Sequence, residues 1–278
     1  MSAKPEPTTA PTPSFPLVRE VKVQRGQGGA VEHVVDCVAE ERPIGLMYQG
    51  VPHVVMLASP ADLEDLGVGF TLSEGIAAER SDIHSVDVVA DGESLTVNLG
   101  ISSGSFTALL RQRRNLAGRT GCGLCGVENV EDAIRSPQRV GTGIRVTPDE
   151  LHVQLAALQS LQPVNARTGS VHAAAWALPG KGIQLVREDV GRHNALDKVI
   201  GALARADRDC SEGYFIITSR ASFEMVQKTA MMGVSFVAAV SAPTALAIDI
   251  ADKTGVTLVG FARENRFVIY SHSERLQS

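Results

Sequence analysis

The chain has 278 residues, of which 44% are hydrophobic and 21% charged, a composition typical of a soluble globular protein with one large or two modest domains. Its net charge of −5 gives no reason to expect nucleic-acid binding. No apolar run reaches the roughly eighteen residues that a membrane span needs.

The N-terminal segment, residues 1–16, is predicted to be a disordered tail. It is rich in proline and threonine and contains neither an apolar segment nor an arginine pair, so it lacks the pattern of an export signal. The chain has four cysteines, and without a secretory signal we expect reduced thiols and a cytoplasmic location. Cys37, in an alternating apolar run, and Cys210, in a polar connector, are expected to be structural or incidental.

Residues 17–117 are predicted to form a small α+β domain. Apolar alternation, apolar residues at helical spacing and the turn signal Asp91-Gly92 are the patterns that indicate its elements. In chain order, the expected elements are two or three antiparallel strands within 31–58, a helix over 60–78, a hairpin of 83–89 with 95–99, and a helix over 106–117. The last helix carries a basic run of Arg111, Arg113 and Arg114.

Residues 147–278 predict an α/β domain. Thr147 is followed by proline and then by Glu150 at the third helical position, which indicates a helix start, and this helix is expected to reach about Leu161. Strands and helices then alternate, a pattern typical of a largely parallel sheet buried on both faces. The expected strands are 183–186, 214–218, 236–240, 256–261 and an antiparallel edge strand over 267–271, with helices over 190–206, 221–232 and 243–253.

Polar clusters follow the predicted strands of this domain. In open α/β sheets, ligands bind beyond the carboxyl ends of the strands, where the following helices begin and attract anions. We therefore expect a phosphate-bearing ligand at this edge, although helix capping and loop solvation explain any single cluster equally well. The clusters are Arg187-Glu-Asp189, Ser219-Arg220, Ser241 and Arg263-Glu-Asn-Arg266.

Between the two domains, residues 118–146 are predicted to form a connector that begins with a glycine-rich cysteine loop. The stretch Gly118-Arg-Thr-Gly-Cys-Gly-Leu-Cys-Gly126 places Cys122 and Cys125 at CxxC spacing. Glycine at this density lets the backbone adopt positive φ and come close to a partner. The loop is therefore expected to present sulfur to another molecule.

Three roles compete for this cysteine pair. A structural zinc site needs four ligands, but there is only one CxxC, and His152 and His172 are single and far apart. A thioredoxin-like pair is expected to open a helix in a βαβ unit, whereas this loop follows a helix. The third role is sulfur carriage, for which Arg119 and the basic run can lower the pKa of a thiol. Spacing alone does not rank sulfur carriage far above redox chemistry.

The chain resembles the FdhD family of formate dehydrogenase accessory sulfurtransferases over roughly residues 17–272. The segments that carry this resemblance are Gly121-Cys-Gly-Leu-Cys-Gly126, Thr168-Gly-Ser-Val-His-Ala-Ala174, Glu188-Asp-Val-Gly-Arg-His-Asn-Ala-Leu-Asp-Lys198, Ser219-Arg-Ala-Ser-Phe-Glu-Met-Val-Gln-Lys228, Ser241-Ala-Pro-Thr-Ala-Leu-Ala-Ile-Asp249 and Gly260-Phe-Ala-Arg263.

The resemblance implies a sulfurtransferase that accepts persulfide sulfur from a cysteine desulfurase. It would pass the sulfur to the molybdenum bis(molybdopterin guanine dinucleotide) cofactor, for use by the catalytic subunit of formate dehydrogenase. By the same resemblance Cys122 and Cys125 are the sulfur-carrying pair, with Cys122 bearing the persulfide. The α/β domain is expected to be cytidine-deaminase-like, with three layers, and the protein to be a homodimer.

The family's cofactor-binding stretch matches Phe261, Ala262, Arg263, Glu264, Asn265 and Arg266. Arginine suits bidentate phosphate contact, and Phe261 can stack on a purine ring or lie buried in its strand. A guanine nucleotide such as GDP is expected to mimic the cofactor, and no resident metal is expected. Further candidates at this edge are Asp189, Arg192, His193, Ser219 and Arg220.

Alternatives remain for two of these candidates and for the function. Asp189 suits a guanine edge or the start of the following helix, and His193 suits proton transfer, phosphate binding or helix packing. Deamination is excluded, because His172 is not followed by the catalytic glutamate and the CxxC lies before the histidine. A cofactor-binding chaperone without sulfur transfer and a dithiol oxidoreductase stay open as other functions.

Overall fold

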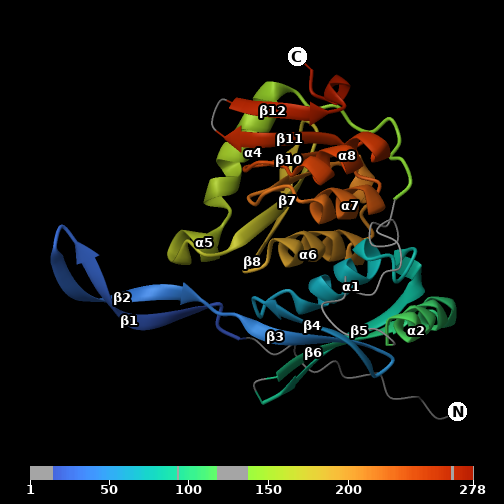
Figure 1. The fold of residues 1–278 in the computed structure, drawn as a ribbon, viewed down its shortest axis with the longest axis horizontal. Coiled ribbons are helices and arrows are strands. Elements are labelled where there is room, and N and C mark those ends of the chain that lie inside the picture. The colour runs from blue at the N-terminus through green and yellow to red at the C-terminus, as the bar shows by residue number, and fades with distance from the viewer. Residues whose placement is uncertain (1–14, 93, 118–136, 264–265, 278) are drawn as a thin grey trace, which may run out of the picture.

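The computed structural model describes residues 15–92, 94–117, 137–263 and 266–277. Cys122 and Cys125, like Glu264 and Asn265, therefore lie outside the described residues. The described chain is mixed α/β, with sheets of two, four and six strands and helices layered between and around them (Figure 1).

The four-stranded sheet belongs to the N-terminal half and has the order β4-β3-β6-β5. The antiparallel strands predicted within 31–58 and the predicted hairpin are confirmed, because β3 pairs antiparallel with β4 and β5 with β6. Strands β3 and β6 run parallel at the centre. Helix α1 begins after Asp62, and α2 follows β6. The bounds are β3 (Arg42–Tyr48), β4 (Val51–Ala58), α1 (Leu63–Ser73), η1 (Arg80–Asp82), β5 (Ile83–Asp91), β6 (Ser94–Ile101) and α2 (Ser103–Ala117).

Strands β1 (Val18–Gln27) and β2 (Ala30–Ala39) form a separate antiparallel hairpin that projects from the body of the protein (Figure 1). Of these two strands, only the second was expected from the sequence. Val31 and Val35 near its tip are 66% and 60% exposed, so alternation here does not mark a buried face.

The six-stranded sheet has the order β12-β11-β10-β9-β7-β8. Its centre is parallel as predicted, since β10 pairs in parallel with β9 and β11, and β12 forms the predicted antiparallel edge. The bounds are α4 (Pro148–Ser160), α5 (Pro163–Thr168), β7 (His172–Leu178), β8 (Gly182–Asp189), α6 (Arg192–Arg205), η2 (Cys210–Glu212), β9 (Tyr214–Ile217), α7 (Phe223–Met231), β10 (Phe236–Ala239), α8 (Ala245–Thr254), β11 (Thr257–Arg263), β12 (Arg266–Ser271) and η3 (Ser273–Arg275).

Strand β7 was not predicted, and it changes the topology, because it pairs antiparallel with both β8 and β9. Its sequence, His-Ala-Ala-Ala-Trp-Ala-Leu, is a continuous run without alternation and is rich in alanine, a strong helix former. The run is buried on both faces of the sheet. A short apolar run flanked by Gly169 and Pro179-Gly180 is the signal that could have identified it.

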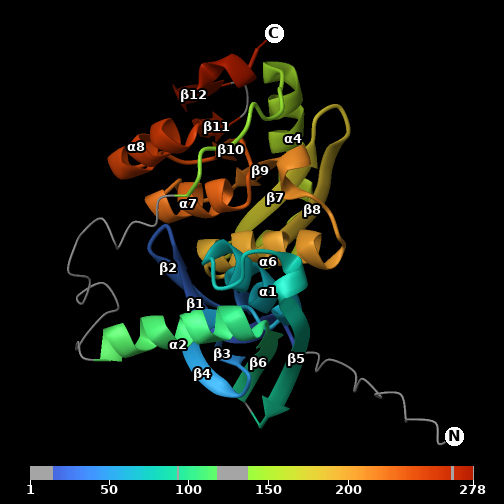
Figure 2. The ribbon, with the colours of Figure 1, turned by 90° about the vertical axis from the view of Figure 1, so that its right-hand side faces the viewer.

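Alternate side chains of the central strands enter two different cores, which gives this domain three layers. On β9, Tyr214 and Ile216 pack in the core formed with α4, while Phe215 and Ile217 pack in the core formed with α6 and α7. Figure 2 shows α4 on one side of the sheet and α7 and α8 on the other. Likeness to cytidine deaminases stays a prediction.

The second of these cores continues into the N-terminal half through contact between α1 and α6. The domain boundaries drawn from the sequence also stay a prediction. No helix in the described ranges is both long and apolar enough to cross a bilayer. The start of α4 is confirmed, because the Thr147 hydroxyl accepts a hydrogen bond from the Glu150 amide at 3.2 Å.

Candidate cofactor-binding rim

Strands β8, β9, β10 and β11 all point the same way, so their carboxyl ends meet along one edge of the sheet. Helices α6, α7 and α8 begin at this edge, and their N-termini favour negative charge. We call this edge the rim and define it by His172, residues 189–193, Ser219, Arg220, Ser241, residues 261–263 and Arg266. The rim brings together the described candidates from four separate strand ends.

Phe261 is displayed at the rim rather than buried. The pairing of β11 with β12 shifts between Gly260 and Arg263, which marks a bulge. Phe261 has φ 51°, an unusual value for an aromatic residue, and its side chain is 40% exposed. Its amide donates to the Ser241 carbonyl at 3.1 Å, which anchors the bulge to the end of β10. Between the two alternatives for Phe261, this geometry favours the exposed ring.

The arginines of the same stretch are exposed. The Nε of Arg263 donates to the Val240 carbonyl at 2.9 Å, so this side chain extends across the end of β10. Arg266 is exposed at the start of β12, while Ala262 is buried and contributes backbone alone. Two guanidinium groups and one exposed aromatic ring therefore lie at the same strand end.

The carboxylate of Asp189 is occupied by donors of the protein itself. It is fully buried, and Oδ2 pairs with the Nζ of Lys198 at 2.6 Å while accepting from the Ser59 amide at 3.0 Å. Oδ1 accepts from the Gly191 amide at 2.8 Å and from Asn194 at 2.9 Å. Four donors occupy this carboxylate, so it has no oxygen left for a guanine edge. Asp189 is not the helix cap either, because the N-cap of α6 is Gly191; its carboxylate instead accepts from Gly191 and Asn194 at the start of the helix.

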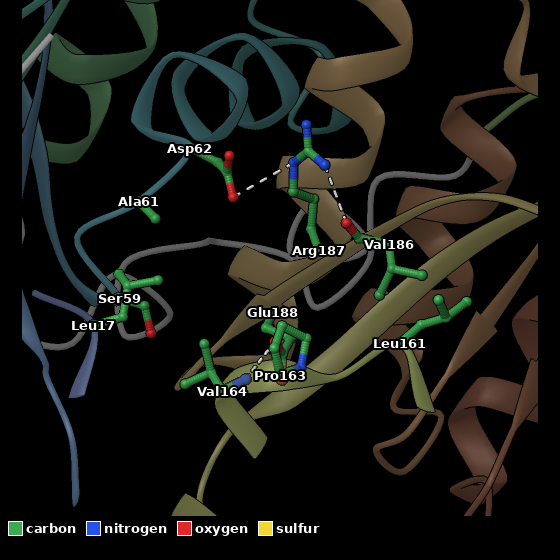
Figure 3. A pocket seen from close by; sticks show the side chains of 10 residues that line it. All are labelled: Leu17, Ser59, Ala61, Asp62, Leu161, Pro163, Val164, Val186, Arg187 and Glu188. Atoms are coloured by element: carbon green, nitrogen blue, oxygen red, sulfur yellow. Dashed lines mark hydrogen bonds and ion pairs between the residues drawn. The ribbon is translucent and has the colours of Figure 1, made fainter. Parts of the chain in front are cut away.

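The two residues before Asp189 are also bound by protein groups. Arg187 donates from Nη2 to Asp65 at 2.9 Å and pairs with Asp62 at 3.5 Å, and Glu188 accepts the amides of Val164 and Asn165 at the start of α5. Both arginine and glutamate line a cavity of about 250 Å³ between the two halves of the chain (Figure 3). The side chains of Arg187 and Glu188 are therefore occupied by the protein itself, as expected if they support neighbouring helices and loops rather than a ligand.

Two histidines, one arginine and one glutamate lie together in the part of the rim near α6. The Nε2 of His193 lies 2.9 Å from the carboxylate of Glu224 on α7, and this contact is the main cause that lowers the pKa of Glu224. Burial, followed by the positive charge of Arg192, lowers the pKa of His172. The Nε of Arg192 is buried and has no hydrogen-bond acceptor among the described residues. The Nε of Arg192 is therefore an unpaired, buried donor within the described part of the rim.

The remaining rim residues come from the ends of β9 and β10. Ser219 is 4% exposed, and its hydroxyl donates to the carbonyl of Arg220 at 3.0 Å, whereas the Arg220 side chain is exposed. Glu224 was not singled out from the sequence, and His172 was considered there only as a zinc ligand and as a deaminase histidine. For Glu224, the signal was its position one residue after Phe223, at the start of a helix that begins at the rim.

The two described cysteines have the structural surroundings expected of them. Cys37 lies half-buried in β2 with its sulfur 3.9 Å from the Nη2 of Arg167. Cys210 is 5% exposed, and burial raises the pKa of its thiol to about 12. Neither geometry presents sulfur to a partner.

The comparisons with known proteins agree over nearly the whole chain. The family model described as "FdhD/NarQ family" matches residues 39–277. "Sulfur carrier protein FdhD" of Xanthomonas axonopodis pv. citri is 50% identical over 254 residues, covering 91% of this chain and 90% of that protein. The protein of the same name from Cupriavidus necator is 46% identical over 276 residues, covering 99% and 96%.

A solved structure shares the fold. It is a proposed formate dehydrogenase accessory protein from Desulfotalea psychrophila, with a TM-score of 0.76 at 21% identity, covering 94% of this chain and 100% of that one. From the family match and the close relatives, this chain belongs to the FdhD/NarQ family.

Proposed function

We propose that this protein is a cytoplasmic sulfurtransferase that loads sulfur onto the molybdenum bis(molybdopterin guanine dinucleotide) cofactor of formate dehydrogenase. The observation that carries the proposal is the pair Cys122 and Cys125 in a glycine-rich CxxC segment, in a chain about 50% identical to proteins named sulfur carriers. We further propose that the protein works as a homodimer, receives sulfur from a cysteine desulfurase and serves the formate dehydrogenase catalytic subunit.

Sulfur acceptance requires one nucleophilic thiolate. Cys122 attacks the outer sulfur of the donor persulfide, the sulfur–sulfur bond of the donor breaks, and the donor cysteine leaves as its thiolate. A new persulfide then stands on Cys122, with no outside oxidant or reductant. Cys125 assists or relays: its attack on the inner sulfur of Cys122 releases hydrosulfide and leaves a disulfide, so the two thiols supply both electrons.

The rim supports binding of the cofactor as substrate. Arg263 and Arg266 are exposed and suited to bidentate phosphate contact, and Phe261 offers a stacking face for a purine. Three helix N-termini and the buried Nε donor of Arg192 add to this preference for an anion. Glu264 and Asn265 complete the proposed stretch by sequence.

The first test is sulfur loading. The protein is incubated with a cysteine desulfurase and cysteine without added reductant, and intact mass and peptide mapping locate any added sulfur. We expect one sulfur atom on Cys122, removable by dithiothreitol and absent in Cys122→Ala. Cys37→Ala is the matched control and should load normally. A Cys122–Cys125 disulfide that forms equally well without the desulfurase and cysteine, and no sulfur gain in their presence, would instead support the dithiol oxidoreductase.

The second test separates transfer from delivery alone. A strain that lacks this protein is complemented with Cys122→Ala, and formate dehydrogenase activity is measured. A chaperone that only delivers the cofactor would still restore activity, so restored activity would contradict the proposal.

The third test addresses the rim, with GDP as probe in equilibrium titrations. Phe261→Ala and Arg263→Gln should each weaken GDP binding by about tenfold, the equivalent of roughly 1.4 kcal/mol. Arg25→Gln, which removes an exposed arginine from the projecting hairpin, should bind GDP like the unaltered protein. Equal affinity of all variants for GDP would show that the rim does not bind GDP.

A further inference from the structure

A basic pocket lies at the end of the six-stranded sheet opposite to the rim. It is a cavity of about 640 Å³ lined by residues 139–143, Arg145, Glu274 and Arg275. Its walls adjoin Ser235 and Gly255, which precede β10 and β11, so the pocket faces the amino ends of strands whose carboxyl ends form the rim. The segment that lines it passes beside α8 towards α4 (Figure 1), and the Val140 amide donates to Thr254 at the end of α8.

A buried guanidinium group forms one wall. Arg275 is 7% exposed and donates from Nε to the Thr142 carbonyl at 2.8 Å and from Nη2 to the Gly141 carbonyl at 3.1 Å. Its Nη1 donates to the Gly255 carbonyl at 2.8 Å and to Thr257 at 3.1 Å. These partners are neutral, and the nearest described carboxylate, on Glu274, is 3.9 Å away and 61% exposed. The positive charge of Arg275 is thus held in place but only weakly neutralised.

The loop over this arginine is fixed in one geometry. Gly143 has φ +70°, and a side chain there would collide with Ser235, so the position requires glycine. Arg275 binds the carbonyls of Gly141 and Thr142, and in a trans peptide the next amide points the opposite way. The amides of Thr142 and Gly143 therefore point away from Arg275, and within the described chain neither has an acceptor.

Two exposed arginines flank the loop. Arg139 extends along Gly255, where an added Cβ would lie 3.2 Å from its Cγ, and Arg145 stands at the other end of the loop. Burial is the main cause that lowers the pKa of Arg275; the charge of Glu274 opposes it, and the charge of Arg139 adds a smaller lowering, because the two guanidinium groups repel each other. The pocket thus gathers three arginines against one glutamate in a chain whose net charge is −5.

We propose that this pocket binds the phosphate groups of a small molecule, with Arg139 and Arg145 as the direct ligands. Arginine forks match phosphate oxygens bidentately, and backbone amides in a fixed loop are common phosphate donors. The volume suits a ligand of the size of a nucleotide or smaller. The site is separate from the rim and from the proposed sulfur transfer, so each can be tested without the other.

Inorganic pyrophosphate is the first probe, titrated calorimetrically into the full chain at low salt. We expect saturable binding that weakens roughly tenfold for each of Arg139→Gln and Arg145→Gln. Both side chains are exposed, so the melting temperature should not change. Arg25→Gln on the projecting hairpin is the matched control and should bind as the unaltered chain does.

Hydrogen exchange of the unaltered protein locates the pyrophosphate site without any substitution. Pyrophosphate should protect the amides of residues 140–146, and this protection should be lost in the Arg139→Gln/Arg145→Gln double variant, whereas any protection of residues 258–263 at the rim should remain. No saturable binding, or binding that disappears in Arg263→Gln but persists in the Arg139→Gln/Arg145→Gln double variant, would overturn the proposal.

A second titration, in the Arg263→Gln variant, compares GDP with pyrophosphate and so shows whether the pocket recognises a nucleoside diphosphate or the diphosphate group alone. Tighter binding of GDP than of pyrophosphate, with loss in the Arg139→Gln/Arg145→Gln variant, identifies a nucleoside diphosphate. Equal affinity for the two identifies the diphosphate group alone. Either result supports a phosphate site, whereas binding of both GDP and pyrophosphate that is unchanged by the Arg139→Gln and Arg145→Gln substitutions contradicts it.

Discussion

Gly69 on α1 and Gly201 on α6 face each other where the two halves of the protein join. A Cβ built on either residue would lie 2.8 Å from the backbone nitrogen of the other. The carbonyls of Asp197 and Asp65 are closer still to the Cβ positions of Gly69 and Gly201, respectively. The two helices therefore touch backbone to backbone, which only glycine at both positions permits.

The same crossing buries charge beside the glycines. Asp197 is 1% exposed, and its carboxylate accepts from Ser73 of α1 at 2.6 Å and pairs with Lys228 of α7 at 3.0 Å. The side chain of Asp197 thus ties α6 to both neighbours, while its carbonyl lies against Gly69. Close approach of the helices is what brings these groups within hydrogen-bond distance.

Gly69→Ala should destabilise the protein by at least the roughly 1–3 kcal/mol that overpacking a core costs. The added methyl group meets backbone rather than a movable side chain, so α1 must shift away from α6. Urea unfolding measures the loss. Gly104→Ala is the matched control: this glycine lies in α2 with no atom near its Cβ position, and alanine there should be neutral or slightly stabilising. Equal effects of the two changes would contradict the close contact.

Lys198→Met should cost about 3–5 kcal/mol, because it leaves the buried carboxylate of Asp189 without its counter-charge. The comparison is Arg19→Gln, which breaks an ion pair whose arginine is 66% exposed and should cost at most about 1 kcal/mol. Both free energies of unfolding are measured in the same denaturant. A small loss for Lys198→Met would mean that Asp189 is not the anchor of α6.

His172 should titrate below the ordinary histidine value, since burial and then the charge of Arg192 lower its pKa. Arg192→Gln removes that charge and should raise the pKa of His172. NMR titration of the histidine ring, assigned with His172→Gln, measures both values. Arg145→Gln, at the far end of the sheet, is the control and should leave the titration unchanged.

GDP at the rim should also raise the pKa of His172, because phosphate charge favours the protonated ring. By linkage, GDP would then bind more tightly as pH falls towards that pKa. If saturating GDP leaves the titration of His172 unmoved, the bound phosphates are not near this part of the rim.

Cys210 should resist alkylation in the folded protein. With a pKa of about 12, roughly one thiol in ten thousand is ionised at pH 8, and reactivity requires the thiolate. Reactivity should therefore increase as pH rises towards 12, or when urea exposes the thiol. Iodoacetamide labelling with peptide mapping follows each cysteine, and half-buried Cys37 gives the comparison. Similar labelling rates of Cys210 in folded and unfolded protein would refute its burial.

Much of the fold was predictable because local patterns report local structure. Alternation and turn residues identified the β5–β6 hairpin, and Thr147 with Glu150 identified the start of α4. Strand β7 was missed because an alanine-rich run buried on both faces has no period to reveal it. The projecting hairpin was predicted only in part, because strand β1 was missed, and the alternation of its second strand leaves Val31 and Val35 exposed.

The family, the cysteine pair and the order of most helices and strands can be read from the chain without its structure, because motif spacing and periodicity are properties of neighbouring residues. The folded structure was needed to show that Asp189 forms an ion pair with Lys198, that a bulge turns Phe261 outward, and that the backbones at Gly69 and Gly201 are in contact. Each of these depends on residues far apart in the chain, whose contact is set by the path of the backbone and by burial.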